Sequence, residues 1–139
     1  MANSDPPERE LLKPVLRLFP KDRYRRFVEV PLGRKRIDIL CVPKEQLLPQ
    51  ISIELKVREW RRALWQAIVN LQIAQESYVA IWYRYQDRVM KHRSLMEQYG
   101  IGLIVVDALS AQKVFESKGR ARRIPKEQKK AFYEALTRV

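Results

Sequence analysis

The period of the hydrophobic positions changes several times along the chain, and each change marks a predicted element. Apolar residues recur at helical spacing over residues 11–19, which predicts an opening helix. Asp5 is a candidate N-cap of this helix, because Pro6 suits a first helical position and Glu8 completes a capping pattern. Strand-like runs follow at residues 26–30, 35–42 and 51–57. Residues 31–34 join the first two runs as a hairpin connection.

The second half of the chain alternates helical and strand-like periods. A helical period over residues 60–75 leads to a short apolar strand at 78–82, and a second helix is expected over 87–99. Gly100 is well placed to end that helix in a left-handed conformation. The remaining expected elements are a buried strand at 101–106, a short strand near Val114 and an amphipathic helix started by Pro125.

This order of elements indicates an α/β fold with a mixed central sheet flanked by helices. Strand, helix and strand at this spacing imply a parallel pair joined by a right-handed crossover. With 139 residues, the chain has room for one domain and hardly for two. We expect residues 1–139 to form that single domain, with a core over about 8–107 and a basic loop and C-terminal helix over 108–139.

Alternation along the strands brings three charged side chains together. In the second strand Asp38 shares a face with Leu40 and Val42. A carboxylate in such an apolar stripe is costly unless it is paired or binds a cation. In the third strand Glu54 and Lys56 project from one face. We expect both to face Asp38 across the two strands.

Two carboxylates and a lysine in this arrangement suit metal-assisted phosphodiester chemistry. The carboxylates can hold Mg²⁺ (or Mn²⁺) while the ion keeps several of its waters. The metal lowers the pKa of a bound water and stabilises transition-state charge, and the lysine orients that water or offsets the phosphate charge. The alternative is an exposed, salt-bridged pair of strands, because Glu and Lys two residues apart are common on solvated strands.

The balance of charge favours a polyanionic partner. The chain has 28 Lys and Arg against 16 Asp and Glu, a net charge of +12, and neutralising phosphates releases condensed counterions. The candidate phosphate contacts are Arg25, Arg26, Arg34, Lys35, Arg36, Arg62, Arg120, Arg122 and Arg123. These contacts predict affinity and salt dependence without sequence readout, and the alternative for each cluster is an ordinary solvated face.

Composition excludes several classes of protein. Four glycines and one cysteine rule out a collagenous chain, a disulfide scaffold and a cysteine-based zinc finger. No stretch approaches the roughly 18 uninterrupted apolar residues of a membrane span. We therefore expect a cytoplasmic protein with no membrane partner, in which Cys41 is reduced and buried.

The chain resembles the PD-(D/E)XK nuclease superfamily in its charged residues and their order. Asp38, then Glu54-Leu55-Lys56 at the end of the next strand, then a helix and a strand match the superfamily's pattern. The opening 8–13 resembles the Glu-Arg-Glu-Leu segment of archaeal Holliday-junction resolvases, whose first glutamate contributes to the metal site. The resemblance implies a restriction-endonuclease-like αβββαβ core.

By the same resemblance, Glu8 is a metal ligand together with the two strand carboxylates, and Gln66 is the polar residue near the active site on the following helix. Glu8 also lies on the inward face of the projected first helix, although N-terminal capping is an alternative role. Gln66 belongs to a polar stripe spaced by four, Arg62, Gln66 and Asn70, for which plain solvent exposure is the alternative.

The implied function is a metal-dependent endodeoxyribonuclease that hydrolyses phosphodiester bonds, with DNA favoured over RNA. Asp38 and Glu54 bind the metal, Glu8 completes the site, and Lys56 and Gln66 assist. Symmetric cuts in a duplex need two active sites, which makes a homodimer a candidate assembly. The alternatives are a catalytically silent nucleic-acid-binding module of the same fold and an interaction subunit that docks through Trp65.

Two further residues are expected to be structural. His92 is a lone histidine on a helix face that we expect to be exposed. Trp65 lies off the main core face of its helix, and either the C-terminal helix or a second subunit could cover it.

Overall fold

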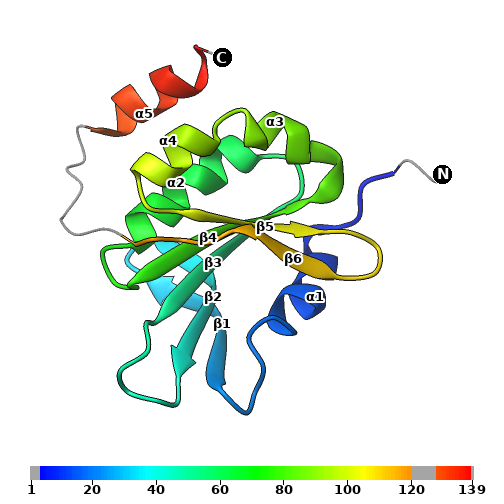
Figure 1. Ribbon diagram of the computed structural model, residues 1–139, viewed down its shortest axis with the longest axis vertical. Helices are drawn as coiled ribbons and strands as arrows, with labels where there is room; N and C mark the ends of the chain where they lie inside the picture. Colours follow the sequence, from blue (N-terminus) through cyan, green and yellow to red (C-terminus); the bar gives the residue numbers. More distant parts are fainter. Residues whose placement is uncertain (1–3, 120–127, 139) are drawn as a thin grey trace.

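The computed structural model describes residues 4–119 and 128–138. Within these residues, a six-stranded sheet holds its strands in the order in which they follow one another along the chain (Figure 1). The strands are β1 (Tyr24–Leu32), β2 (Lys35–Pro43), β3 (Ile51–Lys56), β4 (Glu76–Trp82), β5 (Gly102–Val106) and β6 (Ala111–Phe115).

The directions of the strands make the sheet mixed. Strands β1, β2 and β3 form an antiparallel meander, β3, β4 and β5 run parallel, and β6 returns antiparallel to β5. Parallel neighbours need a crossover connection, and helices provide it between β3 and β4 and between β4 and β5. The expected α/β class, with a mixed sheet flanked by helices, is confirmed.

Helices cover both faces of the sheet and create two apolar cores. The helical elements are η1 (Glu8–Leu11), α1 (Leu12–Leu16), α2 (Trp60–Asn70), η2 (Tyr83–Tyr85), α3 (Gln86–Met90), α4 (Arg93–Gln98) and α5 (Gln128–Leu136). Helices α2, α3, α4 and α5 lie on one side and α1 lies on the other (Figure 1). No helix in the described part of the chain is long and apolar enough to cross a membrane.

The opening helix differs from its prediction at its start. It begins as the 3₁₀ turn η1 at Glu8, continues as α1, and has Pro7 rather than Asp5 at its N-cap position. The carboxylate of Asp5 instead accepts hydrogen bonds from Tyr85 and Arg58, 80 and 53 residues along the chain. A capping pattern identifies a residue whose side chain can accept a hydrogen bond from the start of a helix. In this structure the Asp5 carboxylate accepts from Tyr85 and Arg58 instead.

The helix predicted over 87–99 is two short helices. The break falls between α3 and α4 at Lys91 and His92, and Gly100 follows with a φ of 82°, as expected for a helix-ending glycine. His92 is buried against the Trp60 ring, with centroids 5.3 Å apart, so the expectation of an exposed histidine is wrong. Burial also lowers the pKa of His92.

Helix α5 covers Trp65. The Trp65 and Phe132 rings lie 5.6 Å apart, and Phe132 also meets Tyr99 edge-on at 5.2 Å. The buried residues of α5 are Phe132 and Leu136. The structure therefore selects the C-terminal helix over a second subunit as the cover of Trp65. Pro125, the expected start of this helix, lies outside the described residues.

Candidate active site

Asp38 lies where the sheet's hydrogen-bonded ladder is interrupted on both sides. The register between β2 and β3 ends at the pair Ile39 and Ile53, one residue short of Asp38. On the other side, the register between β1 and β2 omits Glu29, the residue opposite Asp38. Glu29 has a φ of 55°. A non-glycine residue in this left-handed region is strained, and such strain clusters at functional sites.

Carboxylates replace the missing ladder bonds between β2 and β3. The backbone N–H of Leu55 donates to Asp38 Oδ2 at 2.8 Å. The backbone N–H of Asp38 donates to Glu54 Oε2 at 3.3 Å. The expected approach of Asp38 and Glu54 is therefore present, and each carboxylate is oriented by the backbone of the opposite strand.

Burial raises the cost of ionising both carboxylates. Glu54 is 2% exposed, and burial, followed by the nearby Asp38 charge, raises its pKa to about 7. Burial also raises the pKa of Asp38, while the Leu55 N–H bond opposes that shift. A cation between the two groups would remove this penalty, because it favours both ionised forms.

Helix α2 contributes an amide that sequence reasoning passed over. Asn70 is completely buried and its Nδ2 donates to Glu54 Oε2 at 3.1 Å. Gln66, the residue selected from the polar stripe, is half-buried one turn earlier. The side-chain oxygens of Gln66 and Asn70 have no hydrogen-bond partner among the described residues. The spacing by four of Arg62, Gln66 and Asn70 was the sequence signal that could have identified Asn70 as a neighbour of the site.

The positions of Lys56 and Lys35 relative to the carboxylate pair differ from the prediction. Lys56 ion-pairs with Glu8, with Nζ 3.2 Å from Oε1, and both side chains are partly exposed. Lys35, expected only as a phosphate contact, is half-buried near the two carboxylates and donates from Nζ to the Gln66 backbone oxygen at 3.4 Å. Burial lowers the pKa of Lys35, and the charges of Glu54 and Asp38 oppose that shift.

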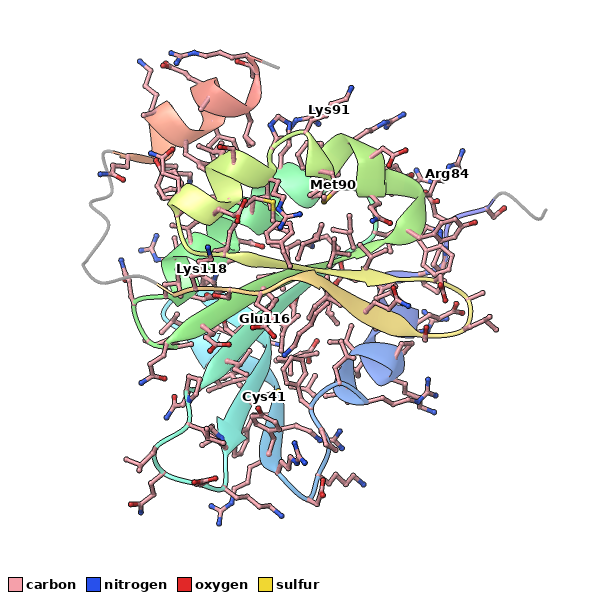
Figure 2. All side chains as sticks on the ribbon, in the orientation of Figure 1. Cys41, Arg84, Met90, Lys91, Glu116 and Lys118 are labelled. Atoms are coloured by element: carbon pink, nitrogen blue, oxygen red, sulfur yellow. The ribbon has the colours of Figure 1, made fainter. Side chains whose placement is uncertain are left out.

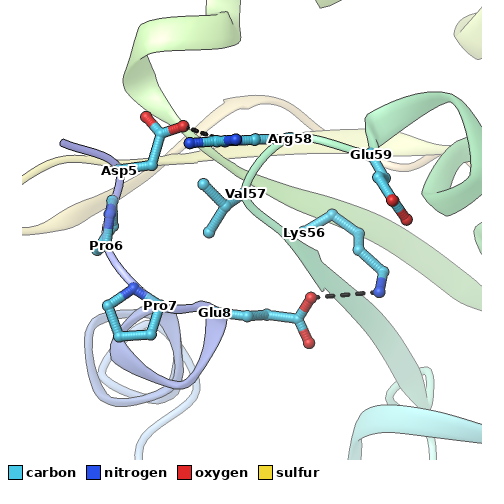
Figure 3. Close-up of a pocket in the computed structure, with 8 residues that line it drawn as sticks. All are labelled: Asp5, Pro6, Pro7, Glu8, Lys56, Val57, Arg58 and Glu59. Atoms are coloured by element: carbon cyan, nitrogen blue, oxygen red, sulfur yellow. Dashed lines mark hydrogen bonds and ion pairs between the residues drawn. The ribbon is translucent and has the colours of Figure 1, made fainter.

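A cleft of about 530 Å³ opens beside Lys56, lined by residues 5–8 and 56–59. The Glu8–Lys56 ion pair spans it, and Arg58 extends to Asp5 on its other side (Figure 3). Tyr85 also donates to Asp5 at 2.5 Å. These bonds fix the N-terminal segment against the end of β3 and so set the position of Glu8.

Glu8, the third predicted metal ligand, has Lys56 as its ion-pair partner. In the part of the chain that the structure describes, no three His, Cys, Asp or Glu side chains come together as ligands for one ion. Burial is the main cause of the raised pKa of Asp38, and the charge of Glu8 adds to it. The carboxylate of Glu8 forms an ion pair with Lys56, and its predicted role as a third metal ligand stays a prediction.

Several of the basic residues expected to bind phosphates contact other parts of the chain. Arg26 donates to the backbone oxygens of Leu16 and Phe19 and so holds the end of α1. Arg36 lies 3.7 Å from Glu29 in an exposed ion pair. The side chains that are exposed and form no ion pair or hydrogen bond with a described residue are Arg25, Arg34 and Arg62. Arg120, Arg122 and Arg123 lie outside the described residues.

Comparison with known proteins adds no family to this geometry. No family model matches the chain, and a search of the curated proteins finds no match.

Proposed function

We propose that the chain is a divalent-metal-dependent nuclease that hydrolyses phosphodiester bonds, with DNA as the foremost substrate. The order of helix, three strands, helix and strand agrees with the restriction-endonuclease-like core expected from the resemblance. Within that order, Asp38 lies in the second strand and Glu54 and Lys56 in the third. The proposal therefore rests on residue type, strand position and side-chain contacts together.

The observation that carries the proposal is the buried carboxylate pair at the interruption of the sheet. Glu54 accepts bonds from Asp38 N–H and Asn70, yet its pKa remains raised to about 7 because burial and the Asp38 charge outweigh them. A purely structural position would be better served by a neutral or apolar side chain, since burying like charges is destabilising.

The residues present fit Mg²⁺ or Mn²⁺. These ions take hard oxygen ligands, and Mg²⁺ commonly uses only one or two carboxylates together with waters and substrate phosphates. Asp38 and Glu54 would hold the ion, so a third carboxylate is not required. When bound, the ion supplies acidification of a water and stabilisation of charge on the phosphate.

The surrounding side chains have separate tasks in this proposal. Asn70 keeps the Glu54 carboxylate in one orientation by donating to Oε2. Lys56, at the edge of the cleft, exchanges its partner Glu8 for a phosphate oxygen when substrate enters. Arg25, Arg34 and Arg62 attract the phosphate backbone without reading sequence. Release from Lys56 also leaves Glu8 free to act as a base toward a water in the cleft.

The test is cleavage of labelled substrates with Mg²⁺, Mn²⁺ or EDTA. Single strands, duplexes, flaps and four-way junctions of DNA, with matched RNA strands, are incubated with wild type, Asp38→Ala and Glu54→Ala. Glu45→Ala, an exposed glutamate in the loop after β2, is the matched control. We expect metal-dependent cleavage by wild type and the control alone.

Two outcomes would overturn the proposal. Near-wild-type cleavage by a folded Asp38→Ala or Glu54→Ala variant would remove the carboxylate pair from the chemistry. Binding without cleavage in every metal would instead identify a catalytically silent nucleic-acid-binding module.

A further inference from the structure

An aromatic side chain is exposed on the edge strand next to the carboxylate pair. Phe27 in β1 is 48% exposed, and its neighbour Val28 is 47% exposed. Neither residue belongs to the two buried cores. Single exposed apolar residues are ordinary on protein surfaces, so the direction in which each side chain points decides whether Phe27 matters.

The register places Phe27 on the same face of the sheet as the candidate active site. Phe27 pairs with Leu40, which pairs with Ser52, and the Ser52 hydroxyl bonds to Ser77 beneath α2. The contacts of Arg26 support this assignment, because its side chain bonds to the backbone at the end of α1, on the opposite face of the sheet. Since successive side chains alternate, Phe27 points to the α2 side and Val28 to the α1 side.

This face is open and leads to Asp38. Helix α2 packs on β3 and β4, and no helix in residues 4–119 or 128–138 covers the α2 side of β1 and β2 (Figure 1). Leu40 is half-buried beside Phe27, and Asp38 follows on the same face two residues along β2, a separation of about 7 Å. Asp38 is therefore the diagonal cross-strand neighbour of Phe27, a separation of about 7–8 Å.

The charge on this face identifies the occupant. Arg25 lies on the α2 side two residues from Phe27, is exposed, and makes no ion pair or hydrogen bond with another described residue. A free guanidinium beside an exposed ring is the combination by which proteins hold unpaired nucleic acid, with the cation on the backbone and the ring on a base. The net charge of +12 disfavours a second copy of this chain on the same face.

We propose that the open α2-side face of β1 and β2 binds an unpaired nucleic-acid strand, with Phe27 stacking on a base and Arg25 contacting the backbone. This inference rests on the proposed nuclease function and adds its substrate class. In a duplex the bases already stack on each other, so Phe27 gains a partner only where bases are unpaired. The substrate is therefore a single strand or a single-stranded region of a branched molecule.

The experiment measures binding without metal, so that cleavage plays no part. Fluorescence anisotropy in EDTA follows binding of a labelled oligothymidylate and of a labelled duplex of equal length to wild type, Phe27→Ala, Phe27→Trp and Val28→Ala. Val28 is the matched control, because it is equally exposed on the opposite face of the same strand. Thermal melting verifies that each variant is folded.

We expect Phe27→Ala to weaken oligothymidylate binding about tenfold and to leave duplex binding within about twofold. Phe27→Trp should retain the affinity for the single strand, and Val28→Ala should leave it unchanged. Equal effects of Phe27→Ala and Val28→Ala, or equal losses for single strand and duplex, would overturn the inference. Unchanged strand binding with a Phe27-dependent dimer in size-exclusion chromatography would also overturn it and identify a subunit interface.

The result separates this inference from the proposed function. Phe27-dependent strand binding without any metal-dependent cleavage would reject the nuclease and retain the single-strand surface. The opposite result is cleavage that Asp38→Ala abolishes, with single-strand binding that Phe27→Ala leaves unchanged. That result would retain the nuclease and reject this surface.

Discussion

Replacing Glu54 with glutamine should stabilise the fold above neutral pH. The glutamine keeps the size of the side chain and an oxygen that can accept from Asn70, and it removes a buried charge beside Asp38. Burial and the Asp38 charge raise the pKa of Glu54 from 4.5 to about 7 in the folded protein. A carboxyl group with a raised folded pKa keeps its full contribution below its unfolded pKa and loses it as the pH rises through the folded value.

The size of the effect follows from the separation of the two pKa values. Between pH 4.5 and about 7 the folded state binds a proton that the unfolded state has lost, so the free energy of unfolding falls throughout this window. The separation corresponds to about 3 kcal/mol at about pH 8 and to about 1 kcal/mol at about pH 5. The free energy of unfolding of Glu54→Gln should therefore exceed that of wild type by about 3 kcal/mol at about pH 8.

Urea denaturation at both pH values, in EDTA, measures this difference. The matched control is Glu45→Gln, which removes an exposed glutamate, and its difference from wild type should be near zero at both pH values. A Glu54→Gln variant that is less stable than wild type at about pH 8, or whose advantage does not grow with pH, would refute the reasoning. Saturating Mg²⁺ should stabilise wild type and leave Glu54→Gln unchanged.

Three further predictions concern the fold. Cys41 is completely buried on the α1 side, and burial raises its pKa to about 12, so thiol titration at about pH 8 should find it unreactive in the native protein and reactive in urea (Figure 2); rapid native reaction would contradict this. Ser77→Ala should cost about 1–3 kcal/mol in urea denaturation, because the Ser52 hydroxyl and the Ala67 carbonyl both lose a buried partner; a neutral effect would show that water replaces the hydroxyl. Phe132→Ala should cost about 3–5 kcal/mol, because the ring is completely buried; a cost below about 1 kcal/mol would mean that α5 does not pack there.

Periodicity predicted the elements that matter most for the site. Strand alternation identified Asp38 and Glu54 as neighbours, because the side-chain period of two leaves little freedom once a register is set. The same reasoning was incomplete for Lys56. Its parity places it beside Glu54, but it lies at the end of β3, where the N-terminal segment supplies Glu8 as a nearer partner.

The features missed by the sequence depend on contacts between distant segments. Asp5 is fixed by Tyr85, and no local pattern records a partner 80 residues away. Asn70 differs from Gln66 by one helical turn, and the way α2 packs on the sheet, which no local pattern records, brings Asn70 to Glu54. His92 is buried because the helix around it breaks and turns its ring onto Trp60.

The most direct test of the account is metal-dependent cleavage by Glu54→Gln at about pH 8, the condition in which this variant is expected to be the more stable protein. One labelled, flapped DNA substrate with Mn²⁺ suffices, with wild type alongside. Wild type should cleave, and the folded, stabilised variant should lose at least about a hundredfold in rate, since in the proposed mechanism the Glu54 carboxylate holds the ion. Cleavage by Glu54→Gln at the wild-type rate would contradict the central claim.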